Sequence, residues 1–301
     1  MKKTIIIVVI IIIAFFGYRY FKGSPDTAVP VDQGSTIDDT TSQASTTQNS
    51  VDNSPISIIG KSVQGRDITA YNYGTGAKNL LFVGGIHGGY SWNTASVAYE
   101  LMKYLETNPS IVPSNIKVTV IPVLNPDGLN SAVGTTSSNF MKSDVSKSEA
   151  KVIASRFNAN NVDLNRNFDC DWKESGKWQN KTVSGGTNPF SEPETQAIKS
   201  YIEKNKPVAV VIWYSSAGGV YASNCHSGVL PETKTIGMAY ADASGYKYDE
   251  SFDFYATTGD MANWLAKVNT PGISILLTNH TDIEWNKNKA GVEALLEYYS
   301  K

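Results

Sequence analysis

Histidine is scarce in this sequence, which limits the metal sites that the chain can build. Only His87, His226 and His280 occur among 301 residues. The net charge is -2 and basic residues do not cluster, so we expect no nucleic-acid partner. There are two cysteines, Cys170 and Cys225. They can pair if the domain lies outside the cytoplasm, and otherwise they are two buried thiols, so both interpretations stay open.

The N-terminus carries the longest apolar run of the chain. Two lysines precede a stretch from Ile5 to Gly17 without any charged residue. With its aromatic end, the segment approaches the roughly 20 residues of a spanning helix. No small-residue cleavage motif follows it. We therefore predict a membrane anchor over residues 1–22, with a cleaved signal peptide as the alternative.

Residues 23–55 lack lysine, arginine and every aromatic residue. Serine, threonine, aspartate and asparagine dominate there, and such a composition cannot bury enough apolar surface to order itself. We predict a disordered linker between the membrane and a folded domain at 56–301. That domain is expected to be extracytoplasmic, or secreted if the N-terminus is cleaved.

Strand and helix patterns alternate through the folded domain, and several strands are apolar on both faces. This indicates a single α/β domain with a largely covered sheet. The predicted strands are 57–59, 67–71, 80–86, 116–123, 208–214 and 273–277, and the predicted helices are 95–107, 193 to about 205, 231–244, 260–268 and 286–299.

Three local motifs fix points along this pattern. The segment 84–94 is a glycine-rich turn between a strand and a helix, which places His87 at the carboxyl edge of the sheet. Residues 125–128, Asn-Pro-Asp-Gly, predict a turn. Residues 191–194, Ser-Glu-Pro-Glu, predict a capping box that opens a helix.

Taken in order, these motifs resemble the zinc carboxypeptidase family of the A and B type. The resemblance extends over about residues 56–300. It rests on the opening segment 60–66, the turn at 125–128, the signature-like run 156–168 and the tyrosine segment 255–264. It implies a mixed, mostly parallel eight-stranded sheet flanked by helices.

The resemblance also implies a substrate site. Asn165 and Arg166 would hold the C-terminal carboxylate of a peptide, for which a planar guanidinium is well suited. Arg156 would stabilise the oxyanion, Tyr255 would cover the substrate, and Asp260 would favour a basic side chain. The alternatives are structural salt bridges for both arginines, a surface aromatic for Tyr255 and a helix N-cap for Asp260.

The metal half of the family pattern is largely substituted. His87 matches the first zinc ligand, but Ser91 occupies the glutamate position. Tyr214 occupies the second histidine position, with Ser215 as the next-best alignment, and Leu276 stands where the general base belongs. Zinc is the cofactor that the family implies, and we expect it to be held weakly or not at all. Loss of the base alone should slow hydrolysis by about 10²–10⁴-fold.

A relocated metal site is a further alternative. It would combine His87 with His280 or His226 and a carboxylate, Asp282 or Glu284. Ordinary solvated loop residues explain the segment 278–285 equally well.

Three functional hypotheses follow from the sequence. The first is a catalytically degraded domain, a pseudoenzyme, that recognises the C-terminal carboxylate of peptides or of peptidoglycan stem peptides. The second is an active metallocarboxypeptidase with unconventional metal ligands. The third is a structural or interaction domain in which the pocket is idle.

Overall fold

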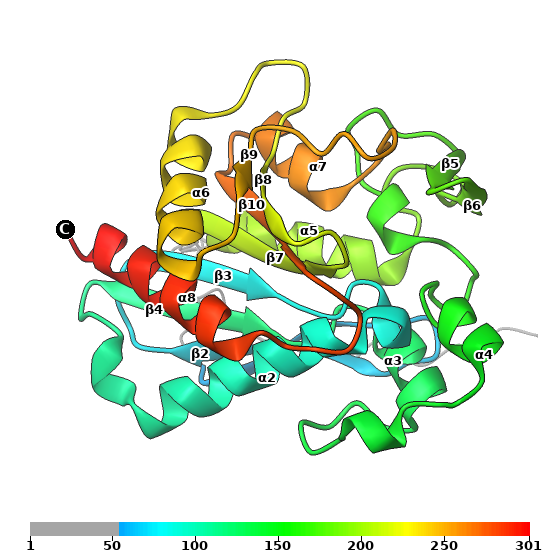
Figure 1. Cartoon of the computed structure of the whole chain (residues 1–301), viewed down its shortest axis with the longest axis horizontal. Coiled ribbons are helices and arrows are strands. Elements are labelled where there is room, and N and C mark those ends of the chain that lie inside the picture. Colours follow the sequence, from blue (N-terminus) through cyan, green and yellow to red (C-terminus); the bar gives the residue numbers. More distant parts are fainter. Residues whose placement is uncertain (1–53) are drawn as a thin grey trace, which may run out of the picture. The chain divides into compact units, whose positions relative to one another are not determined.

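The computed structural model describes residues 54–301. The predicted anchor at 1–22 and all but the last two residues of the predicted linker lie outside this range. Among the described residues, no helix combines the length and apolar character needed to cross a bilayer. Figure 1 shows the described part as one α/β domain.

A mixed eight-stranded sheet forms the centre of the domain, as the sequence and its resemblance predicted. Its spatial order is β1-β2-β4-β3-β7-β10-β8-β9. The strands are β1 (Ile56–Lys61), β2 (Asp67–Tyr73), β4 (Ile116–Ile121), β3 (Lys78–Val83), β7 (Ala209–Ser215), β10 (Gly272–Leu277), β8 (Gly219–Ala222) and β9 (Tyr248–Asp249).

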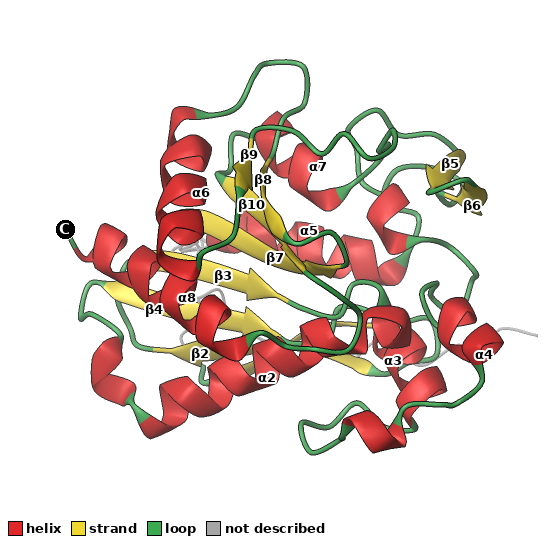
Figure 2. Ribbon diagram, viewed as in Figure 1, coloured by secondary structure: helices red, strands yellow, loops and turns green. Residues whose placement is uncertain are grey.

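The four central strands β4, β3, β7 and β10 are mutually parallel. Parallel strands end at the same edge of a sheet, so the residues that follow them meet there. The register pairs Val83 with Ile212, and Leu276 with Tyr214. The yellow arrows in Figure 2 show β3 and β7 ending on the same side. This edge carries the pocket described below.

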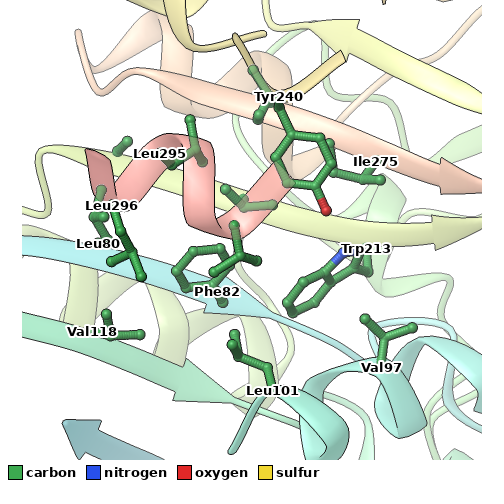
Figure 3. Close-up of a cluster of buried hydrophobic side chains, with 14 of the residues drawn as sticks. Leu80, Phe82, Val97, Leu101, Val118, Trp213, Tyr240, Ile275, Leu295 and Leu296 are labelled. Carbon is green, nitrogen blue, oxygen red and sulfur yellow. The ribbon is translucent and has the colours of Figure 1, made fainter. Parts of the chain in front are cut away.

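Helices cover both faces of the sheet, which explains why its central strands are apolar throughout. The first face packs against α2 (Trp92–Thr107), α6 (Pro231–Ser244) and α8 (Trp285–Ser300). The second face packs against α5 (Pro193–Asn205) and α7 (Met261–Lys267). Figure 3 shows the core of the first face, where Phe82 and Trp213 stack with ring centroids 5.5 Å apart.

The remaining elements are short. They are α3 (Pro126–Val133), α4 (Glu149–Ala154), the hairpin of β5 (Ser175–Trp178) and β6 (Lys181–Ser184), and the 3₁₀ turns η1 (Gly88–Ser91), η2 (Pro109–Ile111), η3 (Lys142–Asp144) and η4 (Leu164–Arg166).

Two of the predicted local motifs were wrong in detail. The segment 125–128 opens α3 rather than forming an isolated turn. Asn125 is its N-cap, because Oδ1 accepts from the backbone N–H of Gly128 at 2.8 Å. Helix α5 begins at Pro193 as predicted, but it has no capping box. Glu192 is its N-cap residue without a side-chain cap bond, and the Ser191 hydroxyl donates to Glu192 instead.

A buried asparagine holds the first core together. The Oδ1 atom of Asn288 accepts from Trp213 Nε1 at 2.9 Å and from the Tyr240 hydroxyl at 2.8 Å. Its Nδ2 atom donates to the backbone oxygens of Ile283 and Glu284. The side chain thereby joins β7, α6 and α8.

We predict that Asn288→Ala lowers the free energy of unfolding by about 2–4 kcal/mol, because it leaves two buried donors without an acceptor. Urea unfolding followed by circular dichroism measures this. Asn286→Ala is the control, because Asn286 is exposed on the same helix and should change stability by less than about 0.5 kcal/mol. Equal effects of the two substitutions would contradict the role given to Asn288.

Candidate functional site

A pocket of about 740 Å³ opens at the carboxyl edge of the parallel strands. The structure brings most of the residues singled out in the sequence to its walls: His87, Arg156, Asn165, Arg166, Tyr214, Tyr255, Asp260, Leu276 and His280. Ser91 does not line the pocket; it is 1% exposed and lies in the 3₁₀ turn after His87. Residues spread over nearly 200 positions of the chain therefore converge on one cavity.

Arg156 forms a buried ion pair at the floor of the pocket. Its Nε and Nη2 atoms both lie 2.9 Å from Oδ2 of Asp163. The guanidinium also stacks on the Trp178 ring, 4.4 Å from the ring centroid. The salt bridge that was the alternative role of Arg156 is thus present. The Nη1 atom of Arg156 donates to no atom of residues 54–301.

Asp163 is held as a carboxylate by its neighbours. Burial alone would raise its pKa, but the guanidiniums of Arg156 and Arg166 outweigh burial and lower the pKa below its ordinary value. Its Oδ1 atom accepts from the backbone N–H of Asn165 at 3.1 Å and so caps η4. The ion pair therefore also positions the segment that carries Asn165 and Arg166.

Arg166 is buried but makes no ion pair with any described residue. Its Nε and Nη2 atoms donate to the Lys177 backbone oxygen at 2.9 and 2.7 Å, and Nη1 donates to the Asn165 backbone oxygen at 2.5 Å. These bonds use three of the five guanidinium N–H groups. One N–H remains on each of Nη1 and Nη2. The Tyr255 ring lies 5.8 Å from the guanidinium carbon.

The amide of Asn165 has a fixed orientation. Its Oδ1 atom accepts from the Tyr214 hydroxyl at 3.0 Å and from the backbone N–H of Met261 at 3.1 Å. Two donors on one side define that atom as the oxygen, so the two N–H groups of Nδ2 point elsewhere. Within the described chain they have no hydrogen-bond acceptor, and the residue lines the pocket.

Asp260 lines the pocket and also caps α7, so its alternative role is present. Its carboxylate accepts from the backbone N–H of Asn263 at 3.0 Å and from Nδ2 of the same residue at 2.7 Å. Burial raises the pKa of Asp260 above its ordinary value.

His87, which the resemblance matches to the family's first metal ligand, has both ring nitrogens buried and without a hydrogen-bond partner among the described residues. Its Nε2 atom is 3.6 Å from Asp163 Oδ1. Burial and the charge of Arg156 lower the pKa of His87 well below 6.5, which outweighs the attraction of Asp163. The imidazole is therefore neutral at neutral pH, and the contact with Asp163 is not an ion pair.

Tyr214 and Leu276 pair in register on β7 and β10 beside His87. The ring centroids of His87 and Tyr214 are 5.6 Å apart. Burial raises the pKa of Tyr214 well above 10, so its hydroxyl stays neutral and donates to Asn165. Leu276 presents only carbon atoms to the pocket.

The other two histidines lie in separate places. His280 contacts Ser215 and Ser216, whereas exposed His226 lies 2.7 Å from Asp171. Within residues 54–301, no three side chains of histidine, cysteine, aspartate or glutamate form a group that could hold a metal ion. The relocated site that combined His87 with another histidine and a carboxylate is not formed by these residues.

Sequence reasoning missed several parts of the site. Asp163 lies in the same signature-like run as Arg156, seven residues away, and this acidic residue beside two arginines was a usable signal. Trp178 gave no signal, because it reaches the pocket from a hairpin that the sequence pattern did not predict. Cys170 and Cys225, whose pairing was left open, form a disulfide.

The fold and the site residues place the domain in the metallocarboxypeptidase class. A family model described as zinc carboxypeptidase matches residues 44–295, and the chain belongs to this family. Carboxypeptidase O of Bos taurus is 31% identical over 190 residues, covering 57% of this chain and 48% of the relative. Murein peptide amidase A of Escherichia coli strain K12 is 26% identical over 199 residues, covering 63% and 66%. The chain spans about half the length of the carboxypeptidase O relatives that it matches.

Solved structures share the fold. The match to the murein-tripeptide amidase of Escherichia coli O157 covers 82% of this chain and 94% of the amidase chain, with a TM-score of 0.55 and 22% identity. The match to bovine thrombin-activatable fibrinolysis inhibitor, in complex with tick carboxypeptidase inhibitor, covers 81% of this chain and 88% of the bovine chain, with a TM-score of 0.63 and 17% identity. At these identities the comparison establishes the architecture alone.

We predict that the domain loses stability between about pH 6.5 and pH 4. Burial lowers the pKa of His280 to about 4 and holds that of His87 well below its ordinary value, so the unfolded chain binds more protons in this range. Stability is present above pH 6.5 and falls as the pH falls. For partly exposed His280 the loss at pH 5 should be about 1–2 kcal/mol.

Urea midpoints at pH 7 and pH 5 measure this effect. His87→Gln and His280→Gln should each reduce the difference between the two midpoints, whereas His226→Gln is the control because that side chain is exposed. A pH dependence that all three variants retain in full would assign it to other groups.

Proposed function

We propose that this domain binds the free C-terminal carboxylate of peptides in the pocket and does not hydrolyse them by zinc chemistry. The observation that carries the proposal is Arg166, a buried guanidinium with no carboxylate partner among the described residues and with two N–H groups unused. A buried charge without a counterion is costly, and an anionic ligand would remove that cost.

The surroundings of Arg166 support a carboxylate as that anion. One N–H on each of Nη1 and Nη2 forms the fork that matches the two oxygens of a carboxylate. The two N–H groups of Asn165 Nδ2 are further donors to the pocket. The orientation of this amide is fixed because Oδ1 accepts from Tyr214 and Met261. Tyr255 lies over the guanidinium and would cover a bound chain end.

The residues at the family's metal position do not fit zinc. Zinc prefers neutral imidazole, thiolate or carboxylate ligands. His87 supplies one imidazole, but Ser91 supplies a neutral hydroxyl and the Tyr214 hydroxyl is engaged with Asn165. At the general-base position, Leu276 cannot take a proton from water. The proposal therefore includes no metal-dependent step.

The names of the relatives suggest the ligand class. They include carboxypeptidases and murein peptide amidases, so we propose peptides, including peptidoglycan stem peptides, as ligands. The Cys170–Cys225 disulfide supports an oxidising, extracytoplasmic location, since such bonds persist there. Tethering to a membrane through residues 1–22, or secretion after cleavage, remains part of this proposal.

We predict that the full chain binds a tripeptide with a free C-terminus more tightly than the same tripeptide amidated at that end. Arg166→Gln should weaken binding of the free acid by about 10- to 100-fold, because it removes charge-assisted hydrogen bonds. It should leave the weak binding of the amide unchanged. Isothermal titration calorimetry measures all of these affinities.

Lys181→Ala is the matched control, because it removes one positive charge from an exposed residue that contacts the Trp178 ring but does not line the pocket. It should change the affinity by less than about threefold. Equal affinity for acid and amide, or equal losses in the two variants, would remove the carboxylate site and favour a structural role for the domain.

We also predict that purified chain, equilibrated with excess zinc and then dialysed, retains far less than one zinc per chain. A chelator should leave its thermal unfolding unchanged, because no metal contributes to the folded state. Metal analysis and differential scanning calorimetry measure the two quantities. One tightly held zinc per chain would favour the active metallocarboxypeptidase with unconventional ligands.

A further inference from the structure

Two adjacent serines and a histidine meet in the pocket without any role in the proposed carboxylate site. Ser215 is the last residue of β7 and Ser216 follows it, whereas His280 lies in the loop after the neighbouring strand β10. Figure 1 shows β7 and β10 as neighbours. Ser215 Oγ is 2.9 Å from His280 Nδ1, and Ser216 Oγ is 3.3 Å from Nε2. All three residues line the cavity.

Asn93 determines the direction of these hydrogen bonds. This fully buried amide donates through Nδ2 to the backbone oxygens of Asn279 and Asp282, at 2.8 and 3.0 Å. Its Oδ1 atom can therefore only accept, and it lies 3.2 Å from Ser215 Oγ. The single proton of the Ser215 hydroxyl goes to Asn93.

The tautomer of His280 follows from this order. Because the Ser215 proton is directed to Asn93, Ser215 Oγ accepts from His280 and Nδ1 carries the ring proton. The ring is neutral at neutral pH, so Nε2 is bare and accepts from the Ser216 hydroxyl. Tyr90 packs against the imidazole, with ring centroids 4.4 Å apart.

We propose that Ser216 is a nucleophile activated by His280, and that the pocket carries a metal-independent acyl-transfer activity on esters or amides of carboxylate-bearing acyl compounds. A nucleophile, a base within hydrogen-bond reach and a third group that orients the base are the parts that this chemistry requires. Here the orienting group is the Ser215 hydroxyl, which Asn93 fixes. The activity goes beyond the binding function proposed above.

The reaction balances without an added cofactor. Ser216 Oγ forms a bond to the acyl carbon while its proton passes to His280 Nε2. The bond from that carbon to the leaving oxygen or nitrogen then breaks, and the leaving group takes the proton from Nε2. Water attacks the resulting Ser216 ester, gives its proton to Nε2, and releases the acid as the serine oxygen regains a proton.

Arg156 is the group available to stabilise the oxyanion. The backbone N–H groups of Ala217 and Gly218, which follow the nucleophile, both donate to the Leu277 oxygen and are already used. The guanidinium of Arg156 lines the same cavity, and its Nη1 atom is free of partners among the described residues. The Tyr90 ring contacts both His280 and the Arg156 guanidinium.

Labelling with an alkyl fluorophosphonate tests the proposal directly. In this reaction the serine oxygen bonds to phosphorus, fluoride leaves, and the proton passes through Nε2 to solvent. Intact mass spectrometry of the full chain should show one adduct, and peptide mapping should place it on Ser216. No adduct at all, or an adduct that persists in Ser216→Ala, would overturn the proposal.

Substitutions then separate an activated serine from an ordinary exposed one. His280→Gln should slow labelling by about 10-fold or more, since it removes the base, and the lowered pKa of His280 makes this loss smaller than for an ordinary imidazole. Ser251→Ala is the control, because Ser251 is exposed at the same pocket but donates to Asp253 and contacts no imidazole. Labelling of His280→Gln at the rate of the unchanged chain would show that the imidazole does not activate Ser216.

The role of Ser215 has a separate readout. Nitrogen-15 NMR of the His280 ring should show the proton on Nδ1, and Ser215→Ala should shift the tautomer population toward Nε2–H while slowing labelling.

Two variants separate failure of the proposed carboxylate site from failure of the proposed Ser216 nucleophile. Arg166→Gln abolishes preference for a free C-terminus without affecting labelling, whereas His280→Gln affects labelling without affecting that preference.

Discussion

The buried ion pair between Arg156 and Asp163 is the constraint on which the pocket depends. Both side chains are almost fully excluded from solvent, so removing either would leave the other charge uncompensated at a cost of about 3–5 kcal/mol. Asp163 also caps the turn that carries Asn165 and Arg166. One carboxylate thereby fixes the direction of Arg156 toward the cavity and the position of the neighbouring donors.

The charge balance of the pocket follows from this pair. Asp163 compensates Arg156, whereas Arg166 has only backbone carbonyls as partners. The second buried carboxyl, Asp260, has a raised pKa and bonds to the start of α7. The neutral residues at positions 91, 214 and 276 add no negative charge near Arg166, which makes no ion pair with any residue of 54–301. A buried guanidinium without an ion-pair partner attracts an anion and also opposes a nearby divalent cation, so this one feature supports both halves of the proposed function.

Much of the fold could be predicted from the sequence, because the central strands and covering helices have clear periodicity. The helix over 231–244 agrees with α6 at both ends, and the apolar strands match β7 and β10 within a residue. The short elements failed for a physical reason. Segments such as α3, β8 and the β5–β6 hairpin are too short to show a period, and their local signals are the same as those of turns. The number of strands and the mixed, mostly parallel character of the sheet came from the family resemblance, whereas the order of the strands was not predicted.

The site was predictable only where its residues belong to one local motif. The run from Arg156 to Arg166 is such a motif, whereas Ser215, Ser216 and His280 are separated by about 65 positions and share no pattern. They meet because β7 and β10 are parallel neighbours in a register that pairs Leu277 with Ser215. Two strand ends placed at one edge bring together whatever residues follow them. At this edge two hydroxyls meet one imidazole, an arrangement whose chemistry depends on the register of the sheet and on the amide of Asn93.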